Sequence, residues 1–169
     1  MFYKCRNIKY IDFSSFDSTI IFNMHNMFYE CTSLTEVINL SPVNSEDLSY
    51  LFFNCLNLLR VDFIYLESMN NNVVTNMENM FSNCNKLTSI NLANIYTNKV
   101  TNMNSMFLGC NNLNSLILGE EFDTSSVTDM RYMFANCFSL TSLDISKSNF
   151  NLSNVENMEH MFYDCHSLT

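Results

Sequence analysis

The sequence predicts an α/β solenoid built from stacked repeats, because one pattern of apolar residues recurs along nearly the whole chain. The chain has 169 residues, 47% of them hydrophobic, and contains seven cysteines. Each cysteine follows a phenylalanine by three residues and precedes an aliphatic residue by three. A unit of about 26 residues cannot bury its own apolar face, so neighbouring units must cover one another. The phenylalanine and cysteine pairs are Phe2/Cys5, Phe28/Cys31, Phe52/Cys55, Phe81/Cys84, Phe107/Cys110, Phe134/Cys137 and Phe162/Cys165.

The segment that ends at each cysteine predicts a short amphipathic helix. In Val100-x-x-Met103-x-x-Met106-Phe107-x-x-Cys110, all five apolar residues fall within an arc of about 120° when each residue advances by about 100°. The residues between them are polar and would occupy the solvated side. We therefore expect one helix of about 10 to 12 residues in each unit.

Polar residues mark the ends of these short elements. Ser153-x-x-Glu156 and Thr75-x-x-Glu78 have the pattern of a helix capping box. Asparagine, which occurs 27 times, tolerates the left-handed and turn conformations that a solenoid needs in quantity. A coding bias toward asparagine is the alternative explanation of this excess.

The residues after each cysteine predict a short strand. The spacing Leu113-x-x-Leu116-x-Leu118 ends in the period of two that strands show, and the same pattern over residues 140–145 predicts a strand in that unit. The second unit departs from it, because Val37 is followed two residues later by Asn39.

Stacking such units gives a parallel sheet backed by a layer of helices. Strands lie about 4.7 to 4.9 Å apart and helices about 8 to 10 Å apart, so we expect the stack to curve with its strands on the concave side. We expect one solenoid domain over residues 1–169, with about six repeats, that begins and ends within a repeat.

Composition excludes two classes of partner. The net charge of −9 has the wrong sign for collecting nucleic acid phosphates. The apolar runs are shorter than the roughly 18 residues that a membrane-spanning helix needs, so direct membrane insertion of this segment is not expected.

The cysteines suggest disulfides or a metal site, but both interpretations meet physical objections. Seven thiols cannot all pair within one chain, and neighbouring helices would hold the cysteine Cα atoms more than about 7 Å apart. Zinc sites use closely spaced ligands such as C-x-x-C, which the sequence lacks. We expect buried free thiols that pack as small apolar groups.

Other candidate sites also have simpler explanations. The Met-x-x-Met pairs have the soft ligands that Cu(I) prefers, yet they lie on the same apolar arc as phenylalanine and valine. His25, His160 and His166 occupy three different repeat positions, which suits solvated or capping roles. The sequence shows no catalytic constellation, so we expect a protein without enzymatic activity, cofactor or metal.

The repeat resembles a known family. The string M-F-x-x-C-x-x-L-x-x-L-x-L, preceded by V-T-x-M-x-x as in residues 100–110, is similar to the BspA-like leucine-rich repeats, in particular to the mycoplasma-type lipoprotein repeat of about 26 residues. The resemblance implies a right-handed leucine-rich-repeat solenoid from a surface-exposed, often adhesive protein. It implies a location at the cell surface or outside the cell, and it supplies no catalytic residues.

Function is expected on the concave face, where solenoids usually bind partners. Its side chains should be those that alternate with the buried strand positions, and they are mostly small, hydroxylated or acidic. We expect a protein or glycan partner, on a host or neighbouring cell, with an intracellular scaffold and a structural stalk as alternatives. The candidate residues are Tyr10, Asp12, Glu36, Arg60, Asp62, Ser89, Asn91, Ser115, Ile117, Ser142 and Asp144.

Overall fold

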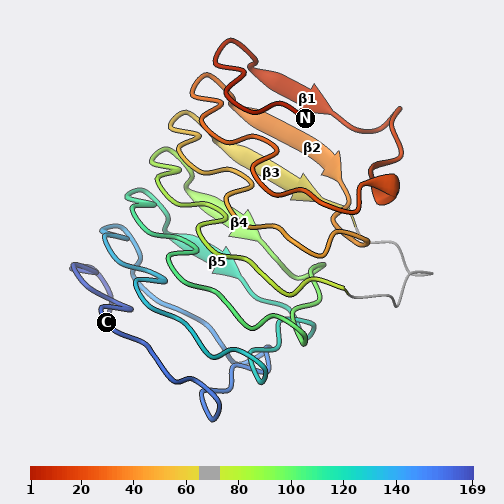
Figure 1. Ribbon diagram of the computed structural model, residues 1–169. Coiled ribbons are helices and arrows are strands. Elements are labelled where there is room, and N and C mark those ends of the chain that lie inside the picture. The colour runs from red at the N-terminus through yellow and green to blue at the C-terminus, as the bar shows by residue number, and fades with distance from the viewer. Residues whose placement is uncertain (65–72) are drawn as a thin grey trace.

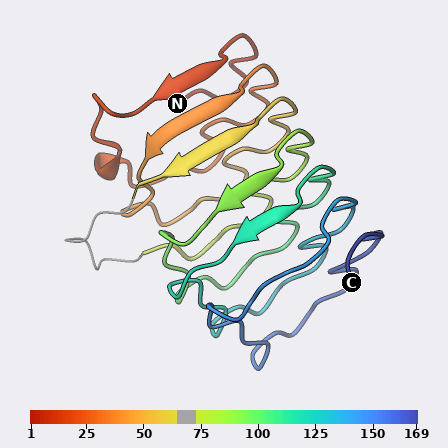
Figure 2. The same ribbon diagram turned by 180° about the vertical axis from the view of Figure 1, so that it is seen from behind.

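The protein is a stack of coils, with the two chain ends at opposite ends of the stack (Figure 1). The structure is a computed structural model that describes residues 1–64 and 73–169. Five short parallel strands lie side by side in chain order on one side of the coils, as the reverse view shows (Figure 2). They are β1 (Tyr10–Asp12), β2 (Glu36–Leu40), β3 (Arg60–Phe63), β4 (Ser89–Asn91) and β5 (Ser115–Ile117).

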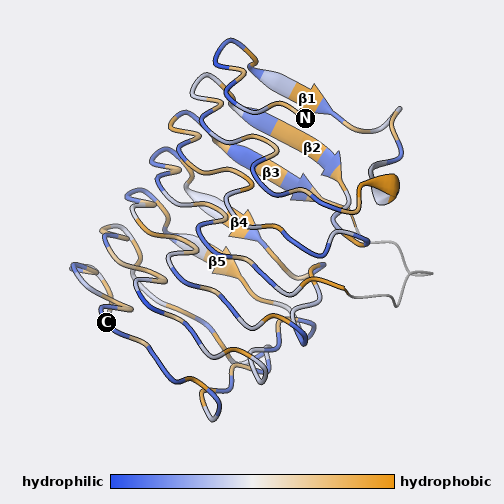
Figure 3. Cartoon of the chain, viewed as in Figure 1, coloured by the Kyte–Doolittle hydropathy of each residue, from blue (hydrophilic) through white to orange (hydrophobic). Residues whose placement is uncertain are grey.

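The strands form where the sequence predicts them in five units. Ile11 lies beside Val37 and Val37 beside Val61, while Ile90 lies beside Leu116. Val37, Val61, Ile90 and Leu116 are buried and Ile11 is partly buried against the same core. Figure 3 shows hydrophobic and hydrophilic segments next to each other along the strands. The parallel sheet of a repeat protein is therefore confirmed for these units.

The strand predicted over residues 140–145 is absent. Main-chain bonds at this coil run from Ser139 to Asn111 and from Thr169 to Thr141, both at 3.2 Å. Leu143 is only half-buried. The apolar pattern is present, but too few ladder bonds accompany it to make a strand.

The irregular second unit has a structural explanation. Asn39 adopts a φ of +59°, and the register between β2 and β3 shifts between Val37 and Leu40. This bulge moves the inward position by one residue, so Leu40 is fully buried and pairs with Phe63. Asparagine is suited to the site because it tolerates the left-handed region.

The prediction of one α-helix per unit is wrong. The only helical element in the described residues is the 3₁₀ turn η1 (Ser18–Ile20). Over residues 100–110 the chain makes successive turns instead, with the amide of Met106 donating to Met103 at 3.3 Å and that of Cys110 to Phe107 at 3.0 Å. These bonds span three residues rather than the four of an α-helix.

Left-handed residues interrupt every predicted helix. Ser105 has a φ of +56° and Gly109 a φ of +72°, each at the third position of a turn, where type II turns carry a positive φ. A residue of this conformation every fourth position is incompatible with a right-handed helix. The equivalent left-handed positions in other units are Lys4, Asn26, Glu30, Tyr50, Asn54, Asn79, Asn83, Tyr132, Asn136, His160 and Asp164.

The two predicted capping boxes are also wrong. The backbone amide of Glu78 donates to the side-chain oxygen of Asn76 at 3.0 Å, and not to the side chain of Thr75 as a capping box requires. The amide of Glu156 donates to the carbonyl of Thr128 at 2.8 Å, across to the neighbouring coil. No helix begins at either position, so the backbone amides of Glu78 and Glu156 donate within a turn and to a neighbouring coil, respectively.

The side of the coils opposite the strands, which we call the turn face, is a second main-chain ladder. It comprises residues 1–8, 23–34, 47–58, 76–87, 102–113, 129–140 and 157–168. Alternate amides of one coil donate to carbonyls of the next at 2.8 to 2.9 Å, from Met103 to Asp129, Ser105 to Arg131, Phe107 to Met133 and Gly109 to Ala135. Neighbouring coils are therefore joined by main-chain hydrogen bonds on both sides of the stack. The predicted curvature, with the strands on the concave side, depended on helices that are spaced more widely than strands, and those helices are absent from the described residues.

The interior is a column of parallel phenylalanine rings. Neighbouring ring centroids are 5.2 to 5.6 Å apart and the ring planes are 1° to 13° from parallel. The column joins Phe2, Phe28, Phe52, Phe81, Phe107, Phe134 and Phe162. This confirms that equivalent residues of successive units line one core.

Candidate functional site

The predicted binding residues lie on one surface, which we call the strand face. Nine of the eleven belong to β1–β5 and alternate with buried or partly buried residues. Ser142 and Asp144 are exposed but lie outside the strands. The curvature prediction depended on helices that the described residues lack, so we define the strand face by its residues and not by its shape. These residues are Tyr10, Asp12, Glu36, Arg60, Asp62, Ser89, Asn91, Ser115, Ile117, Ser142 and Asp144.

The ladder register sets which of these side chains are neighbours. Tyr10 lies beside Glu36, which lies beside Arg60. Ser89 lies beside Ser115 in the same way. Each coil therefore presents one or two side chains at strand spacing, and they form rows across the three-stranded sheet β1–β3 and the two-stranded sheet β4–β5.

Arg60 organises the charged part of the strand face. Its guanidinium donates to Glu36 at 3.0 Å and, from two nitrogens, to Asp62 within the same strand. The hydrogen bonds and charge of Asp62, with a further contribution from Glu36, raise the pKa of Arg60. Most of the side chain of Arg60 is still exposed, so this cluster is fixed in position yet accessible.

Asp12 is held in place by the bulge residue of the next coil. The side-chain amide of Asn39 donates to the Asp12 carboxylate at 2.9 Å, and the backbone amide of Ser14 donates to the same carboxylate at 2.7 Å. The bond from Asn39 and those from Ser14 lower the pKa of Asp12. The face thus carries fixed negative charge over β1–β3 and small neutral side chains over β4 and β5.

The cysteines form a column inside the stack and do not behave as a reactive site. All seven are free, and those of the five central coils are buried as predicted. Six thiols also donate to the main-chain carbonyl of a phenylalanine in the preceding coil at 3.0 to 3.3 Å. Burial raises the pKa of Cys31 to about 11 and that of Cys110 to about 12. These thiols stay protonated and are poor nucleophiles and metal ligands.

Each histidine contacts an aromatic ring of a neighbouring coil, but the three do not lie together. His25 shares a 2.7 Å hydrogen bond with Ser49, His160 stacks on Tyr132 with a centroid distance of 5.1 Å, and His166 is exposed. Within residues 1–64 and 73–169, no three His, Cys, Asp or Glu side chains come together as a metal site would require.

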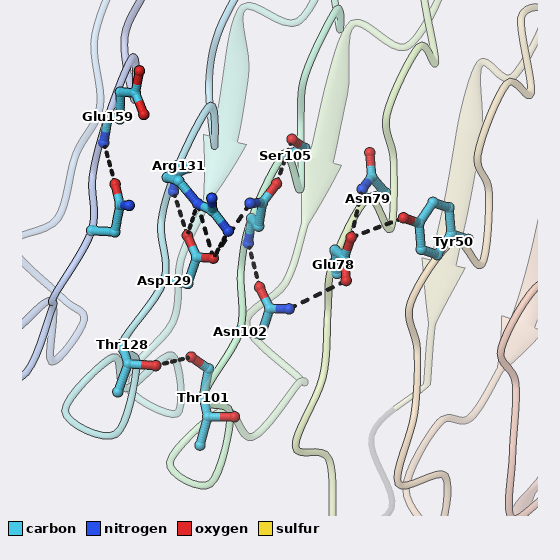
Figure 4. A network of polar contacts seen from close by, with 12 residues as sticks. Tyr50, Glu78, Asn79, Thr101, Asn102, Ser105, Thr128, Asp129, Arg131 and Glu159 are labelled. Carbon is cyan, nitrogen blue, oxygen red and sulfur yellow. Dashed lines mark hydrogen bonds and ion pairs between the residues drawn. The ribbon is translucent and has the colours of Figure 1, made fainter.

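A column of Asn and Asp residues on the turn face was missed by the sequence reasoning. The side chain of Asn102 accepts from the amide of Asn104 at 2.9 Å, and Asp129 does the same for the amide of Arg131 at 3.0 Å (Figure 4). Each member accepts from the backbone amide two residues later and so closes an Asx turn. The members from Asp47 to Asn157 also form main-chain bridges with one another across neighbouring coils. The sequence does contain a signal for this column, because an Asn or Asp directly precedes the first residue of each Met-x-x-Met pair and of the Leu48-x-x-Leu51 pair. These residues are Asn23, Asp47, Asn76, Asn102, Asp129 and Asn157.

Side chains extend this column into a polar network. Glu78 accepts from the hydroxyl of Tyr50 at 2.8 Å and from Asn102 at 3.3 Å, which links three coils (Figure 4). Asp129 pairs with Arg131 at 2.6 Å. Partial burial acts to raise the pKa of Asp129, but the hydrogen bonds from Arg131 outweigh it and the pKa is lowered.

A hollow of about 460 Å³ lies beside the ends of β1–β3. Phe13, Phe16 and Ile64 form its apolar wall, and Asn39 and the polar residues of segment 14–19 line the rest. The hollow forms where the second unit departs from the repeat, at the bulge of β2.

One of the similar solved structures shares this fold. A leucine-rich repeat protein from Bacteroides ovatus is 23% identical with a TM-score of 0.53, covering 83% of this chain and 32% of its own. One from Eubacterium ventriosum is 21% identical with a TM-score of 0.47, covering 78% and 31%. The chain thus spans about a third of the length of these structures, and the first supports the leucine-rich repeat fold.

Sequence comparison gives the family. No curated protein matches the chain. In the described residues, no helix is both long and apolar enough to serve as a membrane span. The family model described as "Mycoplasma protein of unknown function, DUF285" matches residues 1–94 and again residues 75–169, which together span the whole sequence. The chain therefore belongs to the DUF285 family and consists of its mycoplasma-type leucine-rich repeats.

Proposed function

We propose that this chain is a non-enzymatic interaction module of a cell-surface protein and that it binds a polypeptide or glycan through the strand face. The observation that carries the proposal is the set of solvent-facing side chains on β1–β3 and on β4–β5, which the parallel ladder of each sheet holds at fixed spacing. A row that is already ordered loses little conformational entropy on binding. The surface location is inferred from the resemblance of the repeat to BspA-like surface proteins.

The electrostatics of the face favour a partner with positive charge opposite β1–β3. Asp12, Glu36 and Asp62 face solvent there with Arg60 as their cationic neighbour. Next to them, Ser89 and Ser115 present small hydroxyl groups that allow close approach of a polypeptide backbone or a sugar. Complementary charge would speed association and make it sensitive to salt.

The test begins with a partner captured by crosslinking to the intact chain on cells and then purified. Arg60, Asp62, Asn91 and Asp144 are replaced together by alanine, and the dissociation constant is measured by calorimetry. We expect at least a tenfold weaker affinity with an unchanged unfolding transition. A matched control replaces Lys86, Asn104, Thr128 and Glu156 away from the face.

Three outcomes would contradict the proposal. Unchanged affinity in the quadruple strand-face variant would exclude this surface, and an equal loss in the control variant would show that binding is not specific to the strand face. A chain that captures no partner while flanking segments of the same protein do would favour a stalk.

A further inference from the structure

Three aromatic side chains line a second, open hollow on the turn face. Tyr132, His160 and Tyr163 line a volume of about 240 Å³. Tyr132 and His160 occupy the same left-handed position in neighbouring coils, with φ values of +55° and +56°. Coil spacing therefore stacks their rings, with centroids 5.1 Å apart and planes 28° from parallel.

The third ring stands nearly perpendicular to the second. The amide of Tyr163 donates to the carbonyl of His160 at 3.0 Å, which closes a turn between the two residues. Their centroids are 5.4 Å apart and their planes cross at 85°. About half of the Tyr163 side chain is exposed, so the rings form a corner that opens to solvent.

The surroundings of this corner favour a cation. Aromatic ring faces carry negative electrostatic potential. A carboxylate oxygen of Glu159 lies 3.2 Å from the His160 ring. The nearby cation, Arg131, is paired with Asp129 at 2.6 Å and so is already neutralised.

The same fold position binds a cation elsewhere in the chain. Tyr3 and Tyr29 occupy the position of Tyr163, directly after a phenylalanine of the core column. There, the ammonium of Lys4 lies 5.2 Å from the Tyr3 ring centroid and 5.7 Å from that of Tyr29. The residue equivalent to Lys4 after Tyr163 is Asp164, so the last coil has the aromatic residue and an acidic neighbour but no cation of its own.

We propose that the corner formed by Tyr132, His160 and Tyr163 binds a quaternary ammonium group. Such a group is weakly hydrated, its methyl groups pack against ring faces, and its charge is stabilised by the rings and by Glu159. Two rings at a right angle contact it from two sides, which a flat stack of rings would not do. This site lies on the turn face and is independent of the proposed function of the strand face.

The experiment titrates the whole chain with tetramethylammonium chloride at constant ionic strength, using saturation-transfer NMR. We expect saturable millimolar binding that falls at least tenfold in Tyr163→Ala and stays within about twofold of the original in Tyr163→Phe, which keeps the ring. Tyr3→Ala is the matched control, because it removes the equivalent residue at the other end of the stack. Circular dichroism checks that each variant is folded.

A neutral probe separates cation recognition from apolar packing. Choline and its uncharged analogue 3,3-dimethylbutan-1-ol have nearly the same shape, and we expect choline to bind at least fivefold more tightly. Equal affinities for the two, unchanged binding by Tyr163→Ala, or an equal loss in Tyr3→Ala would each overturn the proposal.

Discussion

The thiol of Cys110 donates a hydrogen bond of 3.1 Å to the carbonyl of Phe81 in the preceding coil. The amide of Cys84 donates to the same carbonyl at 3.0 Å, so the carbonyl joins two coils. Each central cysteine therefore does more than fill space, because it adds a polar link inside an apolar column.

Removing that thiol should destabilise the stack. Cys110→Ala deletes one hydrogen bond and leaves a small void, and we expect the free energy of unfolding to fall by about 1 to 2 kcal/mol. Urea denaturation measures the change. Cys5→Ala is the control, because Cys5 is only half-buried, and its loss should be less than half as large. Equal losses would show that the buried hydrogen bond contributes nothing.

Thiol reactivity should follow burial along the column. At pH 8, a pKa of about 12 leaves Cys110 almost entirely protonated, and Cys31, with a pKa of about 11, is also protected. We expect iodoacetamide to label Cys5 at least a hundredfold faster than Cys110, as followed by peptide mass spectrometry. Guanidinium chloride should remove the difference. Uniform labelling of the native chain would contradict the buried column.

Stability should fall at alkaline pH. The buried thiols have raised pKa values, so above about pH 8.5 they keep protons that the unfolded chain releases, and the unfolded state is favoured. Each such thiol lowers the free energy of unfolding by up to about 1.4 kcal/mol per pH unit. Urea titrations at pH 8.5 and 9.5 measure the slope. Cys110→Ala should be less pH-dependent, and an identical slope would argue against this cause.

The left-handed positions give a matched pair of substitutions. Asn136 has a φ of +61°, where a Cβ-bearing alanine is strained and glycine is not. We expect Asn136→Ala to reduce the free energy of unfolding by about 1 kcal/mol, and Asn136→Gly to change it by less than about 0.5 kcal/mol. Thermal melts of the two variants compare them directly. Equal melting temperatures would mean that this turn relaxes to a right-handed conformation.

The repeat and its core could be predicted because both depend on apolar spacing alone. The interval between Phe107 and Cys110 recurs in every unit, and a side chain that recurs in every unit must meet its own equivalents when units stack. The strands follow from the period of two around Leu116, which is independent of the rest of the coil.

The helix could not be distinguished from turns on the same grounds. Spacings of three and four residues place Met103, Met106 and Cys110 on one side of a helix, and turns that close over three residues do the same. The deciding feature was the conformation of the residue before each cysteine. Asn83, Gly109 and Asn136 at that position are residues that favour a positive φ, and together they indicate turns.

The aromatic corner was beyond sequence reasoning for a different reason. The sequence alone predicts a solvated or capping role for His160, because it shares no repeat position with His25 or His166. Its position is instead shared with Tyr132, and the ring geometry depends on coil spacing and on the turn to Tyr163. Such a site becomes visible only when equivalent positions are compared regardless of residue type.

The turn-face ladder, the phenylalanine column and the thiol bonds make the joints between the central coils nearly interchangeable. The amides, carbonyls, rings and thiols that meet at one joint recur at the next, so removing residues 84–109 would bring Asn83 directly before Cys110 and restore the same contacts. Whole coils could thus be lost or duplicated during evolution without a new core having to arise. The length of the rod, and the distance it reaches, is therefore free to vary independently of its fold.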